Sequence, residues 1–387
     1  MIHSETFVEI ATLKERNLIA LKEAREAGRH AVGTYCLFSP TELILAAGAI
    51  PVSLCGTSQK PIPAAEKVLP RNLCPLIKSS YGFAVTDTCP YFHFADFLLA
   101  ETTCDGKKKM YELLGELKPV HVMQLPQIQD EAALEYWLLE VRRLKERLEN
   151  EFGVQITGKA LTEAIRLMNE ERRSLQALQD VCKAIPSPIS GLDLLTVLHN
   201  RGFSVDRRAA IGLVDRFAAE LRQMAAAGIS PFTESTPRIL LTGVPVGIGS
   251  EKLIRIIEES GASVVCLESC GAYKKVEQVR EDGDPLRAIA ERYLKVPCSC
   301  MSPNAGRLEL VERLRREFRA DGVVDLTWLG CHTYAVESSV LKKHLQQRTG
   351  LPFLQIETDY SESDTGQLKV RVEAFLEIVH RSMKRTA

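Results

Sequence analysis

The segment that decides the fold begins with Arg238-Ile-Leu-Leu-Thr-Gly243, continues with Ser250-Glu-Lys-Leu-Ile-Arg-Ile-Ile-Glu-Glu and ends with Ala262-Ser-Val-Val-Cys-Leu267. The first and last runs have the length and apolar content of buried strands, and the middle stretch carries its apolar residues at helical spacing. A strand, a helix and a second strand in this order predict a parallel sheet with helices on its faces.

The same alternation extends in both directions along the chain. Towards the C-terminus it predicts a helix after Asp284-Pro285, further helices at 307–319, 336–347 and 366–380, and strands at 322–327 and 352–356. Towards the N-terminus it predicts helices from Pro40 and at 107–117, and strands at 31–35, 50–54, 97–101 and 119–124. The region from about 130 to 227 carries an almost wholly helical pattern.

The expected architecture is therefore two doubly wound parallel-sheet domains of the α/β class, flavodoxin-like or Rossmann-like, joined by a helical segment. We place the N-terminal α/β domain at 1–130, the helical linking region at 131–236 and the C-terminal α/β domain at 237–387.

Composition excludes several classes of protein. Lys plus Arg is 49 and Asp plus Glu is 50, so the net charge of −1 offers no basic excess for nucleic acid. The longest apolar stretch, Leu43 to Cys55, contains Pro51 and is shorter than the roughly 18 residues that a membrane span needs. The first residues show no export signal. We therefore expect a cytoplasmic protein with neither a membrane nor a nucleic acid as partner.

The 11 cysteines are the most informative feature of the composition, because a reducing compartment does not support a disulfide framework. Ligand chemistry in parallel sheets lies at the carboxyl ends of the strands, and several thiols follow an expected strand or open an expected helix. If the two α/β domains face one another, six of these thiols converge on one cleft; they are Cys36, Cys74, Cys104, Cys270, Cys300 and Cys331.

Thiolates without histidine partners suit an iron–sulfur cluster or zinc. The chain contains no Cys-x-x-Cys knuckle, which disfavours a zinc ribbon, so scattered ligands indicate a cluster buried between domains. Cys182 and Cys266 are expected to be core thiols, and Cys55 to be a loop thiol. Cys89 and Cys298 remain reserve ligands.

Other motifs carry less information about function. The glycines of Gly243-Val-Pro-Val-Gly-Ile-Gly249 favour a tight strand-to-helix turn over a nucleotide site, and no P-loop is present. Glu42 and Glu337 suit the first turns of helices. The run Lys107-Lys-Lys109 is expected to be solvated, with a basic patch beside an anionic cluster or CoA phosphates as the alternative.

Several motifs together resemble the 2-hydroxyacyl-CoA dehydratase and benzoyl-CoA reductase superfamily, and most closely its double-cubane cluster proteins. The resemblance covers nearly the whole chain. The motifs that carry it are Gly33-Thr-Tyr-Cys36, Leu69-Pro-Arg-Asn-Leu-Cys74-Pro, Glu101-Thr-Thr-Cys104-Asp-Gly, Cys298-Ser-Cys300-Met-Ser-Pro-Asn304, Cys331-His-Thr-Tyr-Ala-Val-Glu337 and Glu357-Thr-Asp359.

The resemblance implies which thiols act and what they hold. In the dehydratases three cysteines hold a [4Fe-4S] cluster, and the matching positions here are Cys74, Cys104 and Cys331. In the double-cubane proteins six thiolates hold an [8Fe-9S] cofactor, to which Cys36, Cys270 and Cys300 would contribute. Such relatives look like homodimers that receive electrons from a separate ATP-hydrolysing iron–sulfur reductase.

The first functional hypothesis is a double-cubane reductase component that reduces a small unsaturated substrate such as acetylene. His332, His93 and Tyr35 lie near ligand positions in the sequence and are the candidate proton donors. The enzymatic alternative is an (R)-2-hydroxyacyl-CoA dehydratase subunit with a single [4Fe-4S] cluster. A third hypothesis is an electron-transfer or cluster-storage protein without turnover.

Overall fold

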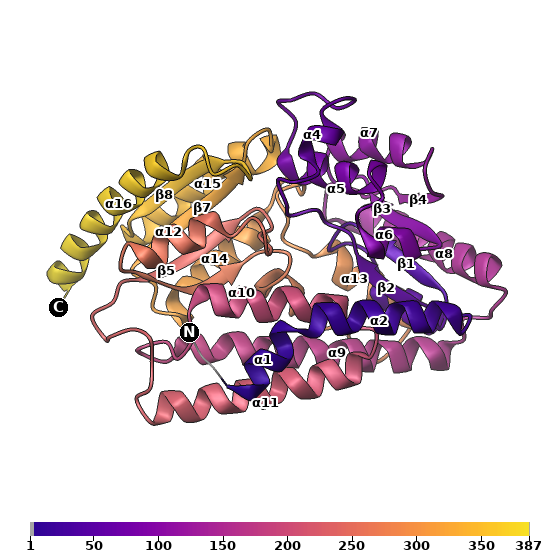
Figure 1. Cartoon of the computed structure of the whole chain (residues 1–387), viewed down its shortest axis with the longest axis horizontal. Coiled ribbons are helices and arrows are strands. Elements are labelled where there is room, and N and C mark those ends of the chain that lie inside the picture. The colour runs from indigo at the N-terminus through magenta and orange to yellow at the C-terminus, as the bar shows by residue number, and fades with distance from the viewer. Residues whose placement is uncertain (1–3, 387) are drawn as a thin grey trace.

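The computed structural model describes residues 4–386 and contains two four-stranded parallel sheets, one in each half of the chain (Figure 1). The first sheet has the order β2-β1-β3-β4 and the second β6-β5-β7-β8. The fold class expected from the sequence is confirmed. The strands are β1 (Ala31–Thr34), β2 (Ile50–Ser53), β3 (Phe97–Glu101), β4 (Val120–Met123), β5 (Arg238–Gly243), β6 (Ser263–Glu268), β7 (Gly322–Trp328) and β8 (Phe353–Thr358).

Helices flank both sheets. Those of the first half are α3 (Thr41–Ala46), α4 (Ile62–Ala65), α5 (Pro75–Val85), α6 (Pro90–Phe94) and α7 (Asp105–Leu114). Those of the second half are α12 (Lys252–Glu259), the 3-10 turn η3 (Tyr273–Lys275), α13 (Pro285–Leu294), α14 (Ala305–Glu317), α15 (His332–Thr349) and α16 (Thr365–Thr386). β5, β6 and β7 are buried along their whole length, which explains their nearly continuous apolar sequences.

Long helices fill the chain between the sheets. They are α8 (Glu131–Phe152), α9 (Gly158–Asp180), η1 (Val181–Lys183), α10 (Gly191–Asn200), η2 (Arg201–Phe203) and α11 (Arg207–Ala226). Each α-helix of this set begins after a residue whose side-chain oxygen accepts a backbone N–H of the first turn, and these caps are Asp130, Thr157, Ser190 and Asp206. The caps explain why this stretch breaks into four separate helices.

Two helices at the N-terminus, α1 (Glu5–Ala11) and α2 (Leu13–Glu26), pack on the helical layer rather than only on the first sheet. Figure 1 shows α1 beside α10 and α11, and α2 contacts η2 and α6. The side-chain amide of Asn200 donates a 3.0 Å hydrogen bond to the Ala11 carbonyl at the end of α1. The helical layer thus includes the N-terminal segment as well as the linking region, which no sequence pattern had indicated.

The glycine motif after β5 forms a tight turn, as expected. Gly243 has φ +117°, and a Cβ atom there would collide with the backbone of Leu326 in β7. Gly249 has φ +99°, and a Cβ atom there would lie 2.8 Å from the Thr57 carbonyl oxygen. Because Thr57 belongs to the loop after β2, Gly249 lets the two α/β halves approach closely, whereas Gly243 lets β5 lie against β7 within its own half. No helix within residues 4–386 is long and apolar enough to span a membrane.

Candidate functional site

A cavity of about 670 Å³ lies where the carboxyl ends of the two sheets face each other. Its walls come from the segments after β1, β2 and β3 on one side and after β5, β6 and β7 on the other. The helices α9–α11, η3 and α13 contribute a third wall, the helical wall. All six thiols singled out in the sequence line this cavity, as do Cys55 and Cys298. The cavity is the natural candidate for the functional site.

Three of the thiols, which we call the capping cysteines, occupy equivalent positions in three helices. Cys74, Cys104 and Cys331 are the N-cap residues of α5, α7 and α15. The free backbone N–H groups and the dipole at a helix N-terminus stabilise negative charge there. Each capping cysteine is therefore placed where its thiolate is favoured by secondary structure alone.

A glycine brings two of the capping cysteines together across the domains. Gly330 has φ +76°, and a Cβ atom there would lie 2.5 Å from the Asn72 carbonyl oxygen and 3.1 Å from the Cys74 backbone nitrogen. The segment that carries Cys331 thus lies against the backbone that carries Cys74. Burial, and then the neighbouring thiols Cys331 and Cys104, raise the pKa of Cys74 to about 12.

Four further thiols, which we call the loop cysteines, lie in irregular segments. Cys36 follows β1, Cys270 follows β6, and Cys298 and Cys300 lie between α13 and α14. A hydrogen bond from Cys300 and the nearby charge of Lys274 hold the pKa of Cys298 at about 6. That hydrogen bond and burial raise the pKa of Cys300. Burial raises the pKa of Cys270 to about 12.

Two buried lysines accompany the thiols. Lys107 is 8% exposed and donates a 2.9 Å hydrogen bond to the Tyr35 carbonyl oxygen, and its charge acts on Cys36, Cys55 and Cys104. The expectation that residues 107–109 are solvated is therefore wrong for Lys107. Only its two neighbours face solvent, because Lys107 lies on the inward face of α7 with Met110, Tyr111 and Leu114.

The second lysine, Lys274, lies beneath the loop cysteines. Its amine is fully buried, 3.1 Å from Glu268 and 2.7 Å from the Tyr334 hydroxyl. Its charge lowers the pKa of both Cys270 and Cys298. The loop cysteines thus depend on cations supplied by other elements, whereas the capping cysteines lie on helix ends.

Two of the three candidate proton donors line the cavity, and the third does not. Tyr35 and His332 line the cavity, and burial raises the pKa of the Tyr35 hydroxyl far above its usual value. His93 does not line the cavity. Its side chain is 60% exposed and its Nδ1 lies 3.2 Å from Asp87. Cys89, the N-cap of α6, is also absent from the cavity wall.

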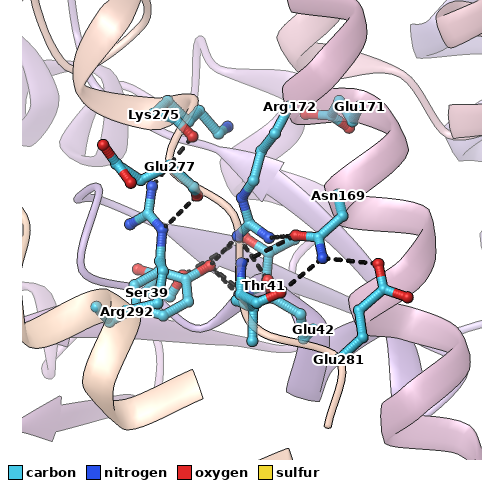
Figure 2. A network of polar contacts seen from close by, with 12 residues as sticks. Ser39, Thr41, Glu42, Asn169, Glu171, Arg172, Lys275, Glu277, Glu281 and Arg292 are labelled. Atoms are coloured by element: carbon cyan, nitrogen blue, oxygen red, sulfur yellow. Dashed lines mark hydrogen bonds and ion pairs between the residues drawn. The ribbon is translucent and has the colours of Figure 1, made fainter. Parts of the chain in front are cut away.

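The two carboxylates considered in the sequence have structural partners. Glu42 is fully buried in α3, 2.5 Å from Arg172, and accepts a 2.8 Å hydrogen bond from Tyr293 (Figure 2). Burial opposes ionisation, but Arg172 and the hydrogen bonds lower the pKa of Glu42 overall. Glu337 in α15 accepts hydrogen bonds from Arg307 and Asn304. Both carboxylates hold neighbouring elements together.

The donor set fits a polynuclear cofactor better than a single ion. Within residues 4–386, no three Cys, His, Asp or Glu side chains come close enough to hold one metal ion. Thiols on opposite walls of a cavity suit a cluster whose irons are spread over its surface. Cys182 and Cys266 are 1% exposed in the apolar core, as expected for structural thiols.

A set of basic residues on the helical wall of the cavity has no counterpart among the residues singled out in the sequence. Arg172, Arg201, Arg207, Lys275 and Arg292 all line the cavity. They come from α9, η2, α11, η3 and α13, so no local pattern connects them. Only the tertiary structure places these side chains on one wall.

Comparisons with known proteins reveal relatives along nearly the whole chain. A family model described as 2-hydroxyglutaryl-CoA dehydratase, D-component, matches residues 36–379. The chain is 47% identical to the "Putative dehydratase subunit YjiM" of Escherichia coli strain K12, over 96% of this chain and 97% of that protein.

More distant relatives include components of both dehydratases and reductases. The chain is 23% identical to the (R)-phenyllactyl-CoA dehydratase beta subunit of Clostridium sporogenes, over 92% of this chain and 94% of that protein. It is 24% identical to a component of the benzoyl-CoA reductase of Thauera aromatica, over 97% of this chain and 96% of that protein. The relatives thus divide between two reaction classes.

Proposed function

Because the chain belongs to the 2-hydroxyglutaryl-CoA dehydratase D-component family, we propose that it is an iron–sulfur reductase component with a double-cubane [8Fe-9S] cluster in the cavity between its two α/β halves. Family membership confirms the resemblance to the 2-hydroxyacyl-CoA dehydratase and benzoyl-CoA reductase superfamily. The finer assignment, which concerns the cluster and the reaction, is our proposal.

The observation that carries the proposal is the presence of two separate groups of thiols on one cavity. The capping cysteines Cys74, Cys104 and Cys331 are enough for one [4Fe-4S] cluster. The positions Cys36, Cys270 and Cys300 would then have no role, although they line the same cavity. Two groups of three thiolates match the ligand requirement of two joined cubanes, with Cys298 as the alternative to Cys300.

When bound, such a cofactor supplies low-potential electrons to a small unsaturated substrate such as acetylene. The chain's own residues would hold it by six thiolates and offset its negative charge with three helix N-termini and the buried amines of Lys107 and Lys274. Tyr35 lines the cavity and is the first candidate proton donor in the proposal, although burial raises the pKa of its hydroxyl and so makes it a weaker acid. His332 lies at the start of α15 on the cavity wall and is the second donor in the proposal.

The proposal includes partners. The chain carries no P-loop, so energy for low-potential electron transfer would come from an ATP-hydrolysing iron–sulfur reductase. We propose a homodimer in the cytoplasm as the functional form.

The alternative function is an (R)-2-hydroxyacyl-CoA dehydratase subunit with a single [4Fe-4S] cluster. The names of two relatives favour it, since one is called a dehydratase subunit, at 47% identity, and another a phenyllactyl-CoA dehydratase subunit. This alternative uses only the capping cysteines and predicts a different paired subunit.

Iron and acid-labile sulfide per chain on anaerobically purified protein test the two candidates. We expect about eight irons, with slightly more sulfide than iron, for the double cubane, and about four irons for the dehydratase. Absence of iron after careful anaerobic work would contradict both. Acetylene reduction with a cognate reductase and ATP then tests the activity, and a His332→Ala variant with full turnover would remove His332 from the proton donors.

A further inference from the structure

The helical wall of the cavity contains a group of five cations, which we call the basic recess. Its members are Arg172, Arg201, Arg207, Lys275 and Arg292. The four arginines are each at most 9% exposed. Figure 2 shows Arg172, Lys275 and Arg292 beside the network around Glu42. Charged groups are rarely buried at this density without matching partners.

The carboxylates that the structure supplies are too few for these cations. Arg201 and Arg207 share the single carboxylate of Glu171, each at 2.5 Å. Arg172 is paired with Glu42. With all five side chains protonated, five cations against two carboxylates leave an excess of 5 − 2 = 3 positive charges.

Two members of the basic recess have no carboxylate partner in the described chain. Arg292 donates only to backbone carbonyls, those of Glu277 at 2.9 Å, Lys275 at 3.0 Å and Lys274 at 3.5 Å. The Lys275 amine forms no hydrogen bond or ion pair with any residue between 4 and 386. Burial, together with repulsion from Arg201, Arg207 and Arg172, lowers the pKa of Lys275 to about 7.

Several guanidinium nitrogens are also left without acceptors. Within the part of the chain that the structure describes, the buried Nε atoms of Arg172, Arg201 and Arg207 and the Nη1 atom of Arg292 have no hydrogen-bond partner. An unpartnered buried donor is costly, and more so when it is charged. The recess therefore carries more positive charge and more N–H donors than its own side chains balance.

The excess positive charge of the basic recess is not the charge that stabilises the thiolates. The lysines whose charges act on the loop cysteines are Lys107 and Lys274, neither of which belongs to the basic recess. The charges that act on Lys275 are Arg201, Glu171, Arg207 and Arg172, and none of them is a thiol. The recess and the cysteines are therefore two distinct parts of one cavity.

We propose that the basic recess binds an oxyanion, the carboxylate or phosphate group of a small ligand that enters the cavity, with Lys275 as the principal contact and Arg201 and Arg207 beside it. Guanidinium groups present paired N–H donors that match carboxylate and phosphate geometry. This inference goes beyond the proposed function and does not depend on the identity of the cofactor. It assigns a charge to the ligand that shares the cavity with the cysteines.

Calorimetric titration of the full-length protein tests the site, with inorganic phosphate and acetate as separate probes against chloride at equal ionic strength. We expect saturable binding of phosphate or acetate but not of chloride, and about tenfold weaker binding in Lys275→Met, because a hydrogen bond to a charged group is lost. Phosphate preference would identify a phosphate ligand, and acetate preference a carboxylate ligand.

A stability measurement and a control variant distinguish loss of anion binding from loss of folding or of any lysine charge. Lys275→Met removes a charge that its neighbours repel, so we expect its melting temperature without anion to be equal to or higher than that of the parent. The control Lys159→Met removes a charge of the same kind from an 86% exposed side chain at the start of α9. Equal phosphate affinity in Lys275→Met and the parent, or binding of chloride as tight as that of phosphate, would overturn the proposal.

Discussion

The capping cysteines and the loop cysteines line the same cavity but are held in different ways. Cys74, Cys104 and Cys331 each stand at a helix N-terminus, where the backbone itself favours a thiolate. Cys36 and Cys270 lie in irregular segments and depend on the buried amines of Lys107 and Lys274 for nearby positive charge. One group is thus supported by local structure and the other by packing between distant elements.

The two groups of cysteines therefore have different structural requirements. A capping cysteine needs only the N-terminus of its own helix, which follows a strand for Cys104 and Cys331 and follows α4 for Cys74. Three such helix ends can form one ligand set where the two sheets meet. A loop cysteine needs a buried lysine from another element whose charge acts on the thiol. We infer that the capping cysteines are the ligands of a first cluster in this fold. The loop cysteines and their two lysines are the additional residues that distinguish a double-cubane protein from a single-cluster subunit.

The largest effect is expected when one of the loop cysteines is removed. In Cys270→Ala we expect iron to fall from about eight to about four per chain and substrate reduction to be lost, because the proposed second cubane loses a ligand. Iron analysis and turnover with the reductase and ATP measure both effects. The control Cys266→Ala removes a 1% exposed core thiol four residues earlier and should retain its iron. If Cys270→Ala keeps the parent's iron and activity, the dehydratase alternative is favoured.

A smaller effect is expected from disturbing the contact between two capping cysteines. Gly330→Ala places a Cβ atom at φ +76° against the Asn72 carbonyl oxygen, and we expect the free energy of unfolding to fall by about 1 to 3 kcal/mol. Thermal melting and iron retention measure the change. The matched control is Gly271→Ala beside Cys270, where an added Cβ atom meets no atom within 4 Å. Equal losses of stability in the two variants would contradict the role of Gly330.

The smallest effect is expected from the lysine whose charge acts on both groups. Lys107→Met removes a buried positive charge that acts on Cys36 and Cys104, so the reduced, more negative cofactor is less stabilised. We expect a midpoint potential about 60 mV more negative, equivalent to about 1.4 kcal/mol for one electron. A spectroscopic redox titration measures this shift. Lys109→Met, whose side chain is 71% exposed, should leave the potential unchanged, and an equal shift in both variants would refute the assignment.

Much of the fold could be predicted because its signals are local. All eight expected strands are present, with ends that differ by only a few residues, since β-branched runs between turn residues specify parallel strands directly. Helix starts were predicted less accurately. The apolar periodicity indicated one helix from residue 107 and another from 336, whereas α7 starts at Asp105 and α15 at His332. Those few residues turn Cys104 and Cys331 from loop thiols into helix caps.

The errors at the site have physical causes. Three consecutive lysines suggested a solvated run, but helical periodicity places Lys107 with Met110, Tyr111 and Leu114 on the buried face of α7. His93 is close to Cys89 in the sequence, yet the short helix α6 directs it to solvent. The periodic signal could have identified Lys107, whereas the exposure of His93 depends on how α6 packs.

The sequence by itself determined the two parallel sheets and the position of each cysteine relative to its strand, because strand–helix alternation and the strand-end rule are properties of short segments. The tertiary structure alone decided which thiols face each other, which lysines neutralise them, and that five cations from five elements form the basic recess. Long-range electrostatic contacts of this kind depend on how separate elements pack, and no local sequence pattern encodes them.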